Sequence, residues 1–275
     1  MPEGDTIFRA ARTLHRALAG QIVVRFESVL PALTRVDENE PIAGRTIESV
    51  TSRGKHVLMR FSGGLTLRTH MRMNGSWHIY RAHERWRRPR SAMRVLIATD
   101  AFEAVGFDIP VAEFATERSL ARQTDLRLIG PDLLADAFDE GDALARFRQR
   151  NDASIADALV NQRIVSGAGN IYKSEVLFAC GISPFAAVRT LSDDELRRIL
   201  TTARRLLRVN VEHPRGGIVT YRGYQRSSRR SERDGLYVYG RARLPCRKCG
   251  TPIEVAAQGS NARLTYYCPR CQFPR

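Results

Sequence analysis

The chain begins Met1-Pro2-Glu3-Gly4-Asp5, an arrangement that can do chemistry at the N-terminus itself. Removal of Met1 would leave Pro2 with a free secondary amine, and α-amino groups titrate near pH ~7.7–8.0, so a useful fraction is nucleophilic at neutral pH. Condensation of the Pro2 amine with an aldehyde or with C1′ of a sugar gives an electron-withdrawing iminium. Glu3 would lie within reach of the carbon that the amine attacks. The alternative is that proline only permits removal of Met1, and that Glu3 and Asp5 favour the first turn of a helix.

Four of the five cysteines form two Cys-x-x-Cys pairs with 18 residues between them. This is the spacing of a zinc ribbon, because each pair turns tightly enough to present two thiolates to one tetrahedral ion. A reducing cytosol would not sustain the same four as disulfides, which disfavours a disulfide or redox role. We therefore expect one structural Zn²⁺ that holds the fold and does not touch substrate. The expected ligands are Cys246, Cys249, Cys268 and Cys271.

The composition favours a polyanionic partner. The 275 residues include 44 basic and 29 acidic side chains, for a formal net charge of +15, and such an excess is typical of proteins that bind nucleic acid. The sequence has no apolar run of about 18 residues and no signal-peptide pattern, so we expect a soluble, cytoplasmic protein without a membrane partner. No Walker pattern is present, which disfavours nucleotide hydrolysis and a nucleotide cofactor.

Two kinds of hydrophobic pattern divide the chain. Residues 5–18 place apolar side chains at spacings of three and four, which predicts an amphipathic helix. Short β-rich runs follow and predict a sandwich or barrel of antiparallel sheets, and periodic segments with polar caps then predict helices. The expected strands are Ile22–Phe26, Thr46–Val50, His56–Phe61, Leu65–Thr69, Trp77–Tyr80, Arg94–Ala98 and Phe102–Phe107. The later helices are expected at Asp139–Arg150, Ala153–Gln162, Asn170–Cys180 and Ser192–Val211.

The fold class expected from these elements is α+β with several domains. An N-terminal antiparallel β-sandwich with a leading helix is expected at 1–115, and a polar linker at 116–131. A helical domain is expected at 132–240, and a four-cysteine zinc-finger hairpin at 241–275.

Two further segments could bind phosphate. The glycine-rich turn Val165–Asn170 joins two expected helices, and the helix that begins at Asn170 would offer backbone N–H groups and a positive dipole end. An ordinary tight helical connection is the alternative. Residues 204–248 carry thirteen basic side chains against three acids, with tyrosines between them. This favours a loop that faces nucleic acid over a merely solvated charged loop.

With these parts in order, the chain resembles the formamidopyrimidine-DNA glycosylase/endonuclease VIII family over nearly its whole length. It shares the Pro-Glu start and a β-sandwich lysine, here Lys55 in Arg-Gly-Lys-His. The family's helix-two-turns-helix element corresponds to residues 161–175, Asn-Gln-Arg-Ile-Val-Ser-Gly-Ala-Gly-Asn-Ile-Tyr-Lys-Ser-Glu. The family's zinc finger carries an arginine on its hairpin, here Arg263 in Asn-Ala-Arg. Four motifs in this order are hard to obtain by chance.

The resemblance implies a bifunctional DNA glycosylase and AP lyase of base excision repair, which acts on damaged DNA. Pro2 would attack C1′ of the damaged nucleoside, displace the base and form a covalent imine, with Glu3 as acid and base. The strand would then leave by β-elimination, and a δ-elimination would follow. Lys55, Asn170 and Arg263 would hold phosphates around a base rotated out of the stack. Lys55 and Arg263 would also serve the reaction, and Arg263 would promote the second elimination.

The resemblance also implies a wedge that fills the gap left by the extruded base. Met73, in His-Met-Arg-Met-Asn-Gly, lies where the family carries it, although a core methionine is the alternative. Partner wedge residues are expected between Phe107 and Phe114. For Lys55 the alternative is a solvated charge at a strand end, and for Arg263 it is a surface decoration of the zinc ribbon.

The opening Glu3-Gly4-Asp5 is more similar to the endonuclease VIII branch, which favours oxidised pyrimidines over oxidised purines. A monomer is the family expectation. Two other hypotheses stay open. One is a non-catalytic, zinc-containing protein for DNA binding or damage recognition, and the other is a zinc-ribbon protein that binds RNA or the ribosome.

Overall fold

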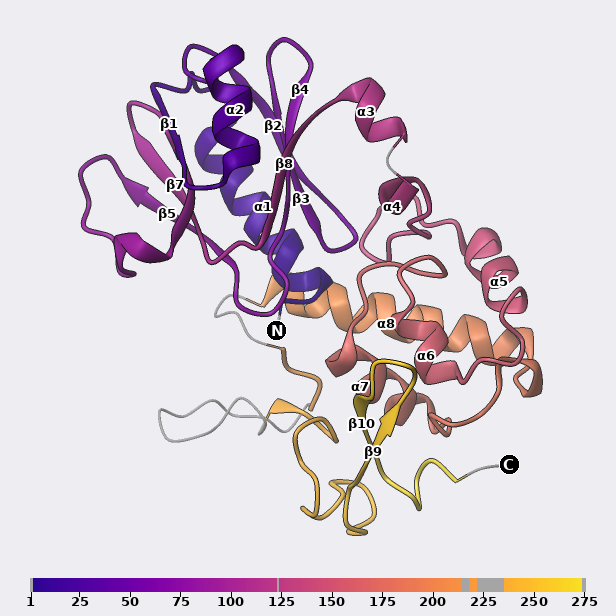
Figure 1. Cartoon of the computed structure of the whole chain (residues 1–275). Helices are drawn as coiled ribbons and strands as arrows, with labels where there is room; N and C mark the ends of the chain where they lie inside the picture. Colours follow the sequence, from indigo (N-terminus) through magenta and orange to yellow (C-terminus); the bar gives the residue numbers. More distant parts are fainter. Residues whose placement is uncertain (1, 123, 214–217, 222–234, 274–275) are drawn as a thin grey trace. The chain divides into compact units, whose positions relative to one another are not determined.

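The computed structural model describes residues 2–122, 124–213, 218–221 and 235–273, which form two compact units (Figure 1). The first unit spans Met1–Leu128 and the second spans Ile129–Arg275. Within the described ranges, no helix combines the length and the apolar character that crossing a membrane requires. Met1 and residues 222–234, which include five of the thirteen basic side chains of the expected basic loop, lie outside the described residues.

Helix α1 (Gly4–Leu18) opens the first unit with the apolar spacing that the sequence predicts. The apolar residues that recur at spacings of three and four, from Ile7 to Leu18, are buried because this face packs against β2 (Ile47–Arg53) and β3 (His56–Phe61). The chain leaves the helix through Gly20, whose φ of +81° is a backbone conformation that favours glycine. The N-terminal residues are therefore attached to a helix that is fixed on the sandwich.

Two four-stranded antiparallel sheets follow, in the orders β1-β6-β7-β5 and β2-β3-β4-β8. Apolar side chains from both sheets and from α1 form one core, which includes Phe26, Phe61 and Ile97. This confirms the expected β-sandwich with a leading helix. The remaining strands are β1 (Arg25–Ser28), β4 (Leu65–His70), β5 (Ser76–Arg81), β6 (Met93–Ala98), β7 (Phe102–Phe107) and β8 (Val111–Thr116), and a short 3-10 helix covers Arg90–Ala92.

The first unit also contains elements that the sequence pattern does not predict. Helix α2 (Pro31–Asn39) has only nine residues and begins with a proline in its first turn. Strand β8 lacks a clean alternation, since its first four residues are all half-buried. The segment expected as a linker, 116–131, contains the short helices α3 (Glu117–Arg122) and α4 (Thr124–Arg127).

The second unit is mainly helical, and its helices start at the polar residues that the sequence marks as caps. Asp139 Oδ1 accepts a hydrogen bond from the N–H of Asp142 at 2.8 Å, and Ser154 Oγ accepts one from Asp157 at 3.2 Å. The helices are α5 (Glu140–Arg148), α6 (Ile155–Val160), α7 (Asn170–Cys180) and α8 (Asp193–Glu212), with a 3-10 turn at Val188–Thr190.

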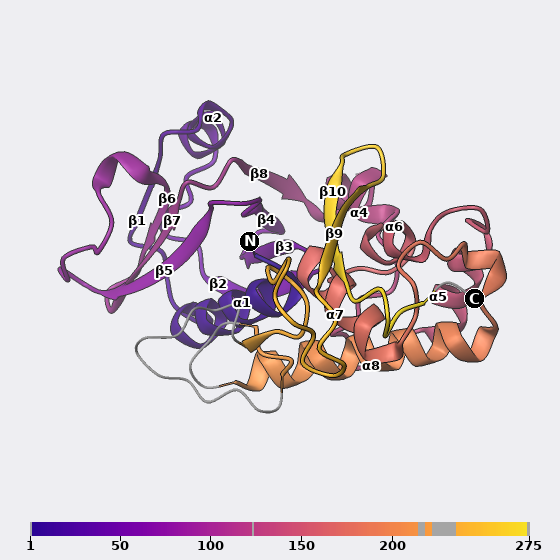
Figure 2. The same cartoon turned by 90° about the horizontal axis from the view of Figure 1, so that it is seen from below.

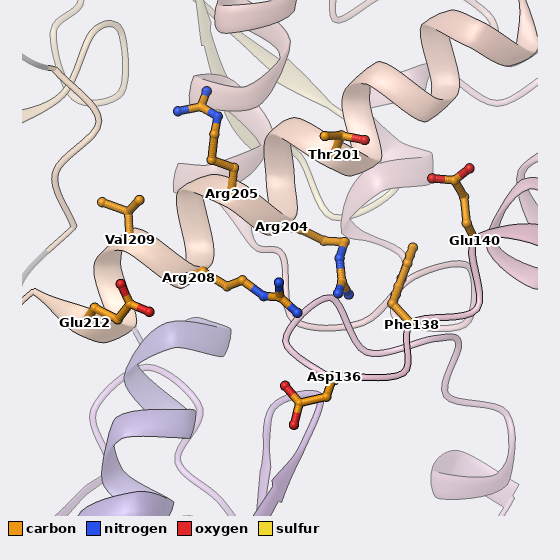
Figure 3. A pocket seen from close by; sticks show the side chains of 9 residues that line it. All are labelled: Asp136, Phe138, Glu140, Thr201, Arg204, Arg205, Arg208, Val209 and Glu212. Carbon is orange, nitrogen blue, oxygen red and sulfur yellow. The ribbon is translucent and has the colours of Figure 1, made fainter.

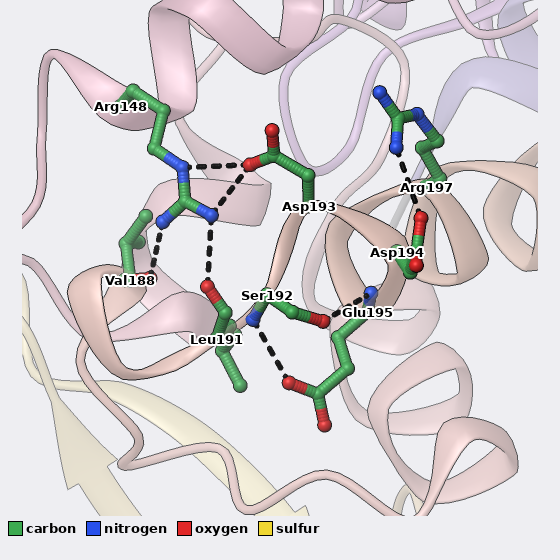
Figure 4. Close-up of polar contacts among 8 residues, drawn as sticks. All are labelled: Arg148, Val188, Leu191, Ser192, Asp193, Asp194, Glu195 and Arg197. Carbon is green, nitrogen blue, oxygen red and sulfur yellow. Dashed lines mark hydrogen bonds and ion pairs between the residues drawn. The ribbon is translucent and has the colours of Figure 1, made fainter.

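The start of α8 is fixed by a capping box and by an arginine from α5 (Figure 4). Ser192 Oγ accepts from the N–H of Glu195 at 3.2 Å, and Glu195 Oε2 accepts from the N–H of Ser192 at 3.0 Å. Arg148 donates to the Leu191 carbonyl at 2.8 Å and to Asp193 at 2.6 Å. These contacts join α5 to α8 and orient the longest helix of the unit.

The second unit ends in an antiparallel hairpin of β9 (Glu254–Gln258) and β10 (Arg263–Tyr267), in which Arg263 pairs with Gln258. Figure 1 and Figure 2 both place this hairpin beside α7, and β10 contacts that helix. The expected helical domain with a zinc-finger hairpin is therefore confirmed.

Candidate functional site

Pro2 and Glu3 lie at the start of α1. Pro2 is half-buried, whereas the Glu3 side chain is fully buried. Glu3 occupies the N-cap position, and its carbonyl accepts from the N–H of Ile7 at 3.0 Å, yet its carboxylate makes no capping hydrogen bond. Starting the helix therefore does not account for the buried carboxylate.

Asp5 is a second buried carboxyl group in this turn. Arg9 Nη2 lies 3.2 Å from its Oδ2, whereas its Oδ1 is buried without a hydrogen-bond partner among the described residues. Burial raises the pKa of Asp5, and the charge of Arg9 offsets only part of that effect. The chain thus places two buried carboxyl groups within three residues of Pro2.

Lys55 lies in the tight turn between β2 and β3, where Gly54 has a φ of +58°. Strand β4, which pairs with β3, brings His70 opposite His56. Their rings meet edge to face with centroids 4.8 Å apart. Burial, followed by the charges of Arg72 and Lys55, lowers the pKa of His70 to about 4. His70 is therefore neutral at pH 7, in a corner whose positive charge suits a phosphate.

Met73 lies in a tight turn directly after β4. Arg72 has a φ of +50°, and the N–H of Gly75 donates to the Met71 carbonyl at 2.9 Å. A Cβ atom at Gly75 would lie 2.6 Å from that carbonyl oxygen, so a larger residue would not fit. The turn leaves Met73 62% exposed, so the core-methionine alternative is wrong.

Partner wedge residues are expected in the segment between β7 and β8. Asp108 has a φ of +47°, and Ile109 is fully buried. Between Phe107 and Phe114, a stretch that the structure describes throughout, no large aliphatic or aromatic side chain is exposed.

Gln162 holds the two turns between α6 and α7. Its side-chain nitrogen donates to the carbonyls of Val160 and Ala168, each at 3.0 Å, and its Oε1 accepts from the N–H of Gly167 at 3.1 Å. Asn170 is the first residue of α7, and its Oδ1 is buried without a hydrogen-bond partner in the described part of the chain. The Asn170 side chain thus has an unused acceptor oxygen at a positive helix end, and it is the amide nitrogen that could donate to a phosphate.

Lys173 and Ser174 connect α7 to the strand that begins with Arg263. The fully buried Lys173 donates from Nζ to the Leu264 carbonyl at 3.4 Å, and Ser174 Oγ accepts from the N–H of Tyr266 at 3.3 Å. Arg263 itself is exposed and lines a hollow of about 440 Å³ between α6 and the hairpin. The two predicted phosphate ligands of this unit thus lie on elements that pack together.

Glu175 ties α7 to the chain on both sides of residues 222–234. Its carboxylate is 1% exposed and accepts from the hydroxyl of Thr220 and from three consecutive backbone N–H groups. These are the N–H groups of Tyr237 at 2.9 Å, Val238 at 2.8 Å and Tyr239 at 2.9 Å. The sequence gives no sign of this network, because the acid's partners are backbone groups about sixty residues away.

The four predicted zinc ligands lie together, with their sulfur atoms all within 4.8 Å of one another. The Cys246–Cys271 and Cys249–Cys268 sulfur distances are 3.9 and 3.5 Å. Zn–S bonds of about 2.3 Å in a tetrahedron require sulfur atoms about 3.8 Å apart, so the cluster fits one zinc ion. Gln272 joins the site to the helices, since its side chain accepts from the Cys268 N–H and donates to a carbonyl of the helical part.

A larger hollow of about 520 Å³ lies along α8 and contains none of the predicted catalytic, wedge or zinc residues, although its arginines belong to the expected basic segment 204–248. Figure 3 shows Arg204 and Arg208 on the side of α8 that faces Asp136 and Phe138. Arg204 already donates to two backbone carbonyls and lies 4.4 Å from the Phe138 ring centroid. Three arginines and three carboxylates line the hollow, so its charges balance and do not favour phosphate. The charged residues are Arg204, Arg205, Arg208, Asp136, Glu140 and Glu212.

Family models match three consecutive parts of the chain. The formamidopyrimidine-DNA glycosylase N-terminal domain matches residues 1–127, and the H2TH domain of the same enzymes matches residues 129–222. The zinc finger found in FPG and IleRS matches residues 243–272. The chain belongs to the formamidopyrimidine-DNA glycosylase/endonuclease VIII family. The finger match and the cysteine cluster together confirm the expected structural Zn²⁺.

Two relatives are similar to the chain over almost its whole length. The probable endonuclease 8 2 of Streptomyces coelicolor is 40% identical over 99% of this chain and 94% of its own. The DNA-(apurinic or apyrimidinic site) lyase Nei2 of Mycolicibacterium smegmatis is 35% identical over 99% of both chains. The complex of Lactococcus lactis Fpg with an abasic site containing DNA has the same fold. Its TM-score is 0.82 at 23% identity, over 99% of this chain and 100% of that one.

Proposed function

We propose that this chain excises oxidised bases from DNA and cleaves the abasic strand, with the terminal nitrogen of Pro2 as the attacking group. Membership of the family makes it a DNA glycosylase and AP lyase of base excision repair. The observation that best supports the residue assignment is the start of α1. There the buried Glu3 carboxylate directly follows Pro2 and does not cap the helix.

The reaction assigned to Pro2 begins after removal of Met1. The amine attacks C1′ while the N-glycosidic bond breaks, and the base leaves with the proton of the amine. The C1′–O4′ bond then breaks as O4′ takes a proton, which gives an iminium on the opened sugar. The iminium acidifies C2′–H, so a base removes that proton and the 3′ phosphate departs. Glu3 is assigned the proton transfers, because it is the carboxylate nearest in sequence to the nucleophile.

The DNA is held by groups that both units present. Lys55 and Arg263 supply cations for phosphates, and the Asn170 amide supplies a neutral donor at a helix N-terminus. The exposed Met73 fills the space that the extruded base leaves. The zinc ion holds the hairpin that carries Arg263, and its four thiolate ligands leave no position for substrate.

The finer assignments rest on the relatives and on the sequence. Oxidised pyrimidines are the favoured lesions, because the relatives of 35–40% identity are named endonuclease 8 or Nei2. A monomer that works in the reducing cytoplasm fits the family and the four free thiols that hold the zinc.

Borohydride trapping tests the proposal. The mature protein, mixed with duplex DNA that contains one thymine glycol or one abasic site, should give a covalent complex that resists denaturation when borohydride is present. Glu3→Gln should reduce the complex on the lesion, whereas Glu48→Gln, an exposed glutamate on β2, should leave it unchanged. A protein that binds this DNA tightly and never forms the complex would instead be a non-catalytic damage-recognition protein.

A further inference from the structure

The connection between β5 and β6, residues 82–92, is held rigidly on the first unit. The Trp86 ring stacks on Tyr80 and meets Phe107 edge to face, with centroids 6.4 and 5.8 Å apart. Its indole nitrogen donates to Glu103 at 2.8 Å, and the N–H of Arg87 donates to the Tyr80 hydroxyl at 3.2 Å. The connection is therefore anchored by Trp86, by the ion pair of Arg90 with Glu27 and by that of Arg88 with Asp108, and the side chains of its other arginines take no part in this anchoring.

Positive charge is in excess around this connection, where seven arginines meet four carboxylates. The carboxylates are already engaged: Glu27 by Arg25 and Arg90, Glu103 by Arg25, Asp108 by Arg88 and Arg94, and Glu84 by the N–H of Arg81. Arg81, Arg85 and Arg87 are exposed, and their guanidinium groups make no hydrogen bond or ion pair with a described residue. Glu84 accepts only from a neutral backbone N–H, so its single negative charge offsets part of theirs, and these three side chains, the arginine surface, keep an excess of positive charge.

Strand β5 connects the arginine surface to the turn that presents Met73. This strand has six residues, which at about 3.3 Å each span about 20 Å, or about six base-pair steps of duplex DNA. Arg88 donates to Ser76 Oγ at 3.3 Å, so the connection folds back along β5 towards the turn that presents Met73. Arg85, Trp86 and Arg87 of the connection line a hollow of about 510 Å³.

We infer that the arginine surface binds backbone phosphates of duplex DNA on one side of the lesion, within about six base pairs of Met73. The inference rests on the proposed function, because the lesion held at Met73 sets the distance. Guanidinium groups bind phosphate bidentately and read no sequence, so this contact is independent of the lesion. It increases affinity and salt dependence and leaves the chemical step unchanged.

Salt-dependent binding tests the inference. The Arg85→Gln/Arg87→Gln protein is compared with its parent on a 25-base-pair duplex that carries a central tetrahydrofuran abasic analogue. The slope of log K against log salt should be smaller by about 1.8, because each lost phosphate contact removes about 0.9. The ratio of the parent's affinity to the variant's affinity should therefore fall about twelvefold as the salt concentration rises from 50 to 200 mM. The Arg85→Lys/Arg87→Lys protein, which keeps the charge, should retain the parent slope.

Two controls separate this contact from a general effect of charge and from misfolding. Arg16→Gln/Arg35→Gln removes two exposed arginines from α1 and α2 of the same unit and should leave the slope unchanged. Lengthening the flanks beyond about six base pairs on each side should not enlarge the difference between the first variant and its parent, whereas a general effect of charge would grow with the length of the DNA.

An unchanged slope in the Arg85/Arg87 variant would overturn the inference. An equal loss in the Arg16/Arg35 control, or a difference that keeps growing on flanks longer than about six base pairs, would also overturn it. Borohydride trapping on the same duplex keeps the two ideas apart. If the parent protein is not trapped, the proposed function fails, whereas a trapped parent with an unchanged variant slope defeats only the arginine surface.

Discussion

Replacement of Glu175 should destabilise the second unit more than any surface mutation. Its carboxylate accepts from the Thr220 hydroxyl and from three backbone N–H groups at 2.8–2.9 Å, and it is 1% exposed. Glu175→Ala leaves the three N–H groups buried without partners, at about 1–3 kcal/mol each. Even the lower end of this range gives a total loss of about 3 kcal/mol in the free energy of unfolding, which lowers the melting temperature by about 6–12 °C.

Glu175→Gln should cost less, because one oxygen remains and the new amide can donate to the Thr220 hydroxyl. One backbone N–H group then faces the N–H group of the new amide instead of an acceptor. We therefore expect a loss of about 1–3 kcal/mol in the free energy of unfolding. The assay is thermal unfolding of the zinc-loaded protein, with Glu212→Ala as a control, since Glu212 is exposed at the end of α8. A Glu175→Ala protein that melts within 1 °C of this control would refute the reasoning.

Three further predictions follow from the site. Cys249→Ser should lose the bound zinc and unfold the finger, because structural zinc contributes about 10–16 kcal/mol in finger peptides; metal analysis and circular dichroism check this. Asp5→Asn should stabilise the protein against urea at pH 7. The pKa of Asp5 is raised in the folded protein, so its charged form opposes folding above the unfolded pKa of about 3.9. The gain in stability should therefore vanish below about pH 4, and a loss of stability at pH 7 would contradict the reasoning. Met73→Ala should change stability by at most about 0.5 kcal/mol, because the side chain is 62% exposed, while it weakens binding to lesion DNA at least severalfold; a large stability loss would contradict the wedge role.

Much of the fold follows from local patterns in the sequence. The seven expected strands and five expected helices all occur, with ends displaced by a few residues, because alternation and polar caps mark them strongly. Helix α2 and strand β8 escape prediction because nine residues and a half-buried hexamer carry weak periodic signals. Tertiary packing, and not local propensity, decides such elements.

The candidate site divides in the same way. The zinc ligands could be predicted, because the spacing of two cysteine pairs is itself the geometric signal. The Glu175 network and the buried Lys173 could not, because their partners are backbone atoms brought near by the fold. The pairing of the carboxylates around the β5–β6 connection is likewise visible only in the structure, and it shows which arginines keep an excess of positive charge.

The most direct test of the central claim is to locate the covalent bond to DNA. After borohydride trapping on abasic DNA and digestion with trypsin and nuclease, mass spectrometry should find the sugar remnant on the peptide Pro2–Arg9, attached to its terminal nitrogen. A remnant on Lys55, Lys173 or Lys248, or full activity of protein that still retains Met1, would contradict the account.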